Sequence, residues 1–153
     1  MSGLRRVVLD TSTLVSAALR VGSLPHQALL KALGTCEICV SSATLDELEQ
    51  VRRLDKFERY LDAETRLGFV ALIRQYAHLF AVAEADELNI QPVCRDLKGN
   101  KFLALAAVCE ADAIISSDHD LLALNPWRCI PVLTPAGFVE PSPDNTRPGE
   151  KFR

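Results

Sequence analysis

The chain has 153 residues, a length typical of one domain, and 48% of them are hydrophobic, enough for a core without disulfides or structural metals. Its formal net charge of -3 argues against a protein that coats nucleic acid through charge alone. No apolar run reaches the roughly 18 residues of a membrane span. The N-terminal MSGLRR lacks the apolar core of a signal peptide, so a cytoplasmic location is expected.

Short apolar runs alternate with segments of helical periodicity, which predicts an α/β fold with a mostly parallel sheet covered by helices. Strands are expected at 6–9, 37–40, 80–83, 113–116 and 130–133. Helices are expected at 13–19, 25–33, 43–53, 63–78 and 101–109. Pro25 suits the first turn of its helix and Gly34 suits its end. The domain is expected to span 1–139, and the proline-rich, polar residues 140–153 are expected to form a flexible tail.

The five cysteines are an odd number and lie mostly in apolar segments, as reduced core thiols do. Cys36 and Cys39 have the C-x-x-C spacing of zinc and redox sites. They fall in a predicted strand, however, and no second Cys or His pair with zinc spacing follows. We therefore interpret both as core residues.

Acidic residues recur where predicted strands end or helices begin. Asp10 ends the strand in VVLDTSTLVSA, ahead of the hydroxyl residues Thr11 and Ser12. In SSATLDELEQV, Glu47 projects from beside the apolar stripe of a helix. Two further segments contribute polar residues at such junctions: CRDLKGNKFLALAAVCEAD with Asp96 and Asn100, and AIISSDHDLLAL with Asp118 and Asp120.

Carboxylates that come together from distant segments repel one another unless a cation lies between them. Mg²⁺ and Mn²⁺ are bound by a few carboxylates together with substrate phosphates. Such a centre can activate water and stabilise the charge that builds during phosphodiester hydrolysis. The acids therefore favour a divalent-metal site.

These four segments, in this order, resemble the four motifs of PIN-domain nucleases, and most closely the branch that supplies toxins of toxin-antitoxin pairs. The resemblance covers about residues 5 to 139. It implies a three-layer fold with a central parallel sheet of about five strands, a Mg²⁺ or Mn²⁺ site and cleavage of single-stranded RNA. It also implies an antitoxin partner and a homodimer.

By this resemblance Asp10, Glu47 and Asp118 are the first, second and fourth acids of the site. Thr11 and Ser12 would orient Asp10 or the metal-bound waters. The third acid falls on Asn100, which removes one negative charge, and Gly99 stands where relatives often have another aspartate. Asp96 or Asp120 would then compensate as metal ligands.

Several alternatives remain open at the level of sequence. Asp10 could be only a helix cap, and His119 could be a general base or a surface residue. Arg52 and Arg53 could steer RNA or form a solvated face. An aspartyl-phosphate enzyme is disfavoured because Ser12 stands where the second aspartate of many such phosphatases is expected. The main rival to a ribonuclease is a catalytically weakened or inactive PIN-like module that binds RNA or protein.

Overall fold

The computed structural model describes residues 5–52 and 62–140. They contain a five-stranded parallel sheet in the order β3-β2-β1-β4-β5. The strands are β1 (Arg5–Leu9), β2 (Cys36–Val40), β3 (His78–Leu79), β4 (Ala113–Ile115) and β5 (Val132–Leu133). The first strand in the chain is thus the central strand of the sheet.

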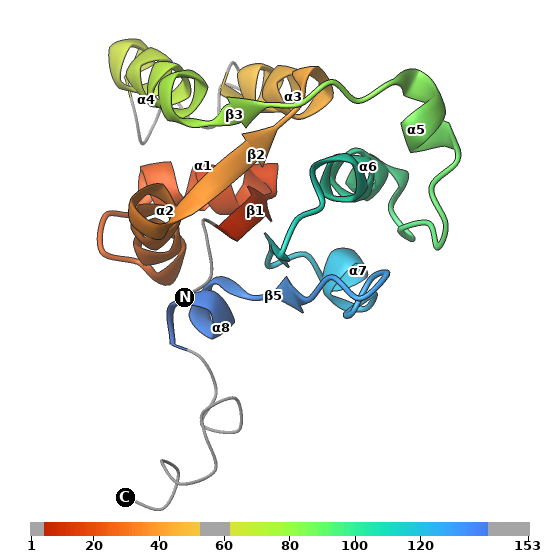
Figure 1. Cartoon of the computed structure of the whole chain (residues 1–153). Helices are drawn as coiled ribbons and strands as arrows, with labels where there is room; N and C mark the ends of the chain where they lie inside the picture. The colour runs from red at the N-terminus through yellow and green to blue at the C-terminus, as the bar shows by residue number, and fades with distance from the viewer. Residues whose placement is uncertain (1–4, 53–61, 141–153) are drawn as a thin grey trace, which may run out of the picture.

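Helices cover both faces of the sheet. Their bounds are α1 (Thr11–Leu19), α2 (Leu24–Thr35), α3 (Ser42–Arg52), α4 (Ala63–Tyr76), α5 (Glu84–Leu88), α6 (Asn100–Cys109), α7 (His119–Leu122) and α8 (Pro135–Val139), with a 3-10 turn η2 (Leu97–Gly99) directly before α6. Figure 1 shows α1 and α2 on one side of β1 and β2 and α6 on the other.

Alternation along β1 separates two apolar cores. Val7 and Leu9 pack with residues of α1 to α4 and α8, whereas Val8 packs with α6 and α7. All three side chains are almost completely buried, as expected for a strand of a parallel sheet covered on both faces. The result is the helix-sheet-helix arrangement of three layers that the sequence predicts.

The strands predicted at 6–9, 37–40 and 113–116 are confirmed to within one residue, and the last one is reduced to β5. The strand predicted at 80–83 is wrong, because the chain pairs with β2 two residues earlier, at His78 and Leu79. The helix predicted to reach residue 78 therefore ends at Tyr76. β3 is an exposed edge strand of two residues, so it has no buried pattern for the sequence to reveal.

The predicted stop at Gly34 is also wrong. α2 runs through it to Thr35, and the backbone N–H of Cys36 closes the last turn on Ala32 before β2 begins at once. Cys36 and Cys39 both lie on β2, as expected. The predicted tail beyond Glu140 lies outside the described residues, so its flexibility and the domain limit remain predictions. Among the helices described, none has both the length and the apolarity to cross a membrane.

Candidate functional site

A cavity of about 890 Å³ opens where β1 ends, between α1, α3 and the start of α6. Its polar lining combines acids and cations. The acids are Asp10, Asp46, Glu47, Asp96 and Asp118, and the cations are Lys98 and Lys101. Four of the predicted acids therefore line the same cavity: Asp10, Glu47, Asp96 and Asp118. Thr11 and Ser12 line it as well.

Asp10 is fixed by hydrogen bonds to both of its carboxylate oxygens. Oδ1 accepts the backbone N–H of Thr13 at 3.0 Å and the Ser12 hydroxyl at 3.2 Å, which caps α1. Oδ2 accepts the Ser116 hydroxyl at 2.5 Å. Only 4% of the residue is exposed. Burial raises the pKa of Asp10 above its ordinary value, although these hydrogen bonds favour the ionised form.

Ser116 joins Asp10 to the segment that carries Asp118. It follows β4 directly, is fully buried, and its oxygen accepts the backbone N–H of Asp118 at 2.9 Å while its hydroxyl donates to Asp10. Asp118 in turn accepts the backbone N–H of Asp120 at 3.0 Å and caps α7. Ser116 was not predicted from the sequence, although its place immediately after a buried strand is the same signal that identified Asp10.

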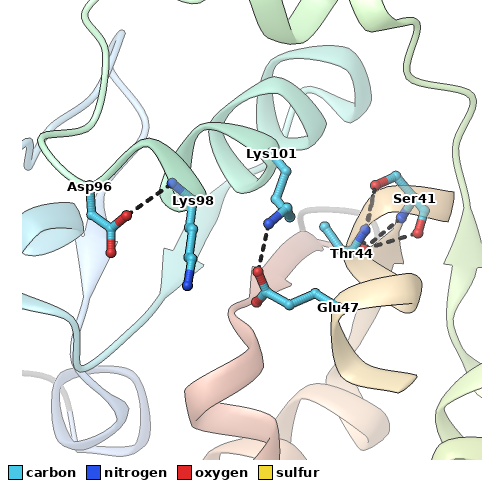
Figure 2. A network of polar contacts seen from close by, with 6 residues as sticks. All are labelled: Ser41, Thr44, Glu47, Asp96, Lys98 and Lys101. Carbon is cyan, nitrogen blue, oxygen red and sulfur yellow. Dashed lines mark hydrogen bonds and ion pairs between the residues drawn. The ribbon is translucent and has the colours of Figure 1, made fainter. Parts of the chain in front are cut away.

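Glu47 is held by a cation on the opposite side of the cavity. The Lys101 ammonium, near the start of α6, donates to Glu47 Oε1 at 2.6 Å, and about a fifth of each side chain is exposed. Figure 2 shows these two side chains pointing toward one another from α6 and α3. Lys101 and Lys98 were not singled out from the sequence, where lysines at a helix start look like solvated residues.

The start of α3 is fixed by a reciprocal pair of hydrogen bonds visible in Figure 2. Ser41 Oγ accepts the backbone N–H of Thr44 at 3.2 Å, and Thr44 Oγ1 accepts that of Ser41 at 2.9 Å. Both residues are buried. Because this cap ties α3 to the end of β2, it determines where Glu47 stands relative to the sheet.

Asn100 does not line the cavity, contrary to the expectation from the sequence. Its Oδ1 accepts the backbone N–H of Cys94 at 2.8 Å, the residue is 9% exposed, and it is not among the residues that line the cavity. Its amide therefore anchors the loop before α6. The neighbouring Gly99 does line the cavity, but a Cβ there would lie 2.7 Å from Cys94 Sγ, so an aspartate at 99 requires the packing to shift.

Of the other predicted residues, those on α7 lie away from the cavity lining, whereas Asp96 is part of it. Asp120 and His119 are on α7, and neither is among the lining residues. Asp96 lines the cavity and caps η2, where its Oδ1 accepts the backbone N–H of Lys98 at 3.1 Å. Arg52 ends α3, but its side chain, like the whole of Arg53, lies outside the description.

The lining acids suit a hard divalent cation in chemical type, because carboxylate oxygens are the ligands of Mg²⁺ and Mn²⁺. Within residues 5–52 and 62–140, however, no three His, Cys, Asp or Glu side chains are grouped closely enough to hold a metal ion. The oxygens of Asp10, Glu47 and Asp118 are engaged by hydroxyl, ammonium and amide donors instead. The lining acids thus match a divalent cation in chemical type, but their side chains would have to move together and exchange partners to bind one.

A family profile described as PIN domain matches residues 6–120. Among solved structures, a chain of VapBC2 from Rickettsia felis, crystallised with a DNA fragment from their promoter, superposes with a TM-score of 0.59 at 12% identity, covering 84% of this chain and 98% of that one. VapC20 from Mycobacterium tuberculosis, described as a sarcin-ricin loop cleaving toxin, superposes with a TM-score of 0.53 at 16% identity, covering 76% and 93%. No curated protein matches. The profile spans most of the chain and the fold agrees with these structures, so the chain belongs to the PIN-domain family.

Proposed function

We propose that this protein is a divalent-metal-dependent endoribonuclease that hydrolyses phosphodiester bonds of single-stranded RNA. The observation that carries the proposal is the convergence of Asp10, Glu47 and Asp118 from three separate segments on one cavity at the end of the central strand. Membership of the PIN-domain family and the likeness to a toxin described as cleaving the sarcin-ricin loop support it.

In this proposal Asp10, Glu47 and Asp118 hold Mg²⁺ or Mn²⁺, with Asp96 or Asp120 as a further ligand. A bound cation of this kind supplies an activated water and neutralises charge on the phosphate. Ser12 and Ser116 orient the Asp10 carboxylate through their hydroxyls, and Ser116 keeps the Asp118 backbone in register with it. Arg52 and Arg53 remain proposed contacts for RNA.

We also propose that the protein is the toxin of a toxin-antitoxin pair that acts in the cytoplasm, with a cognate antitoxin as partner and a homodimer as its assembly. The support is the resemblance of the four sequence motifs to those of such toxins, together with the fold likeness to VapC20, which is described as a toxin.

The second candidate is a PIN-like module that binds RNA or protein without cutting it. The ion pair between Lys101 and Glu47 favours it, together with the neutral residues Gly99 and Asn100 in the third motif. Both features lower the number of acids available to a cation.

Cleavage of labelled single-stranded RNA in Mn²⁺, and its loss in EDTA, distinguishes the two candidates. We expect the wild type to cut and Asp10→Asn not to, while Glu64→Gln, an exposed residue of α4 remote from the cavity, serves as the control. Cleavage that is equal in wild type and Asp10→Asn would reject the nuclease site. RNA binding by a wild type that never cuts would favour the binding module.

A further inference from the structure

Two lysines line the cavity, and one of them, Lys101, forms an ion pair with Glu47. Lys101 is the second residue of α6 and Lys98 precedes it by three positions, so both line the cavity at the same end of that helix. For Lys98 the described parts of the chain show no acid within ion-pair distance, and its side chain is exposed. Among the described residues, the Lys101 ammonium is therefore paired with an acid and the Lys98 ammonium is not.

The engaged ammonium group is strongly held. Only about a fifth of each partner is exposed, and their polar atoms are 2.6 Å apart. In such a partly dry setting an ion pair is stronger than on an open surface. While Lys101 donates to Glu47, it offers an RNA phosphate less attraction, and the Glu47 charge repels that phosphate.

We infer that Lys101 is a phosphate-binding residue that Glu47 keeps occupied in the metal-free protein and releases when its carboxylate binds a divalent cation. The inference rests on the proposed function, in which Glu47 is a metal ligand. A residue in contact with such a ligand lies next to the place where the scissile phosphate must approach. Lys98 extends the same positive edge, and the RNA backbone is the polyanion that two neighbouring ammonium groups attract.

The test measures binding of a fluorescein-labelled single-stranded oligoribonucleotide by anisotropy in EDTA, where no cleavage competes. We expect Glu47→Gln to bind about tenfold more tightly than the wild type, because it frees the Lys101 ammonium. The slope of log affinity against log salt should steepen by about 0.7, the value for one additional phosphate contact on a single strand. Glu47→Gln/Lys101→Met should lose the gain, and Glu47→Gln/Lys101→Arg should keep it.

The matched control is Asp46→Asn, which removes the neighbouring acid of α3 that lines the same cavity. Loss of a negative charge alone would strengthen RNA binding equally in Asp46→Asn and Glu47→Gln, with or without Lys101. Either that result or a gain that survives Lys101→Met overturns the inference. Thermal unfolding of each variant confirms that the comparison is made between folded proteins.

Failure of the inference and of the proposed function give different results. If the wild type cuts RNA in Mn²⁺ but Glu47→Gln gains no affinity, only the role of Lys101 is rejected. If the wild type never cuts RNA while Glu47→Gln shows the gain that depends on Lys101, the phosphate-binding role is supported and the nuclease is rejected. If no variant binds RNA in EDTA and the wild type does not cut it in Mn²⁺, both are rejected.

Discussion

The two sides of the cavity are built in different ways. On the sheet side, the buried residues Asp10 and Ser116 and the partly buried Asp118 backbone form a chain of hydrogen bonds at the ends of β1 and β4. On the helix side, Glu47 and Lys101 meet through long, partly exposed side chains from α3 and α6. Long side chains can exchange partners by changing rotamers, whereas a buried strand end cannot move without disturbing the core. The sheet side is therefore suited to fix a ligand and the helix side to adjust to it.

Removing the charge on the fixed side should have the largest effect. We expect Asp10→Asn to lower Mn²⁺-dependent cleavage of RNA more than about 100-fold, equivalent to roughly 2.7 kcal/mol of transition-state stabilisation. Asparagine can still accept the backbone N–H of Thr13 and cap α1, so the variant should remain folded. Single-turnover rates, with circular dichroism to check folding, provide the measurement. Undiminished cleavage at limiting Mn²⁺ would remove Asp10 from the site.

Gly99, which also lines the cavity, should not tolerate a larger side chain. Gly99→Ala is expected to lower the free energy of unfolding by about 1–3 kcal/mol, because the new Cβ would meet Cys94 Sγ at 2.7 Å. Gly68→Ala on α4 is the matched control, since nothing lies within 4 Å of a Cβ there. It should raise the free energy of unfolding by about 0.4–1 kcal/mol. Urea denaturation measures both, and equal effects would show that the contact at Gly99 relaxes freely.

The adjustable side should control metal affinity. Lys101→Met removes the cation that competes for Glu47, so we expect Mn²⁺ to bind about tenfold more tightly, or about 1.4 kcal/mol. Asn100→Asp is the comparison, because its side chain is turned toward Cys94 and should bring little or no gain. Calorimetric titration with Mn²⁺ separates them. A tighter Asn100→Asp protein would mean that this side chain can turn into the cavity.

The smallest expected effect is on stability as a function of pH. Burial raises the pKa of Asp10 in the folded protein above the ordinary value of 3.8. In metal-free wild type the ionised carboxylate therefore lowers stability at neutral pH, and this penalty disappears as the pH falls through the raised pKa toward 3.8. Asp10→Asn lacks this dependence. Urea unfolding in EDTA should show that the wild type gains stability relative to Asp10→Asn on acidification, and parallel curves would refute the role of burial.

The sequence predicts an acid on each side of the cavity, Asp10 and Glu47, but not the residues that hold them, Ser116 and Lys101. The end of a buried strand and its capping residues are a local pattern, which is why Asp10 could be identified without the structure. Successive residues of a helix differ by about 100° in direction, so whether Asn100 or Lys101 faces the cavity depends on the phase of α6. The η2 turn and the hydrogen bond from Cys94 to Asn100 fix that phase. The two-residue strand β3 was misplaced for a related reason, since only its pairing with β2 defines it.

The strand order has a consequence for where any ligand can bind. After β1 the chain crosses through α1 and α2 to β2 on one side, and after β4 it crosses through α7 to β5 on the other. The connections that leave β1 and β4 thus diverge, and a crevice is left at their carboxyl ends, the topological switch point of an open α/β sheet. Asp10 and Ser116 are the first residues beyond these two strands. The topology therefore creates the crevice whatever residues line it, and the side chains placed there decide only which chemistry it hosts.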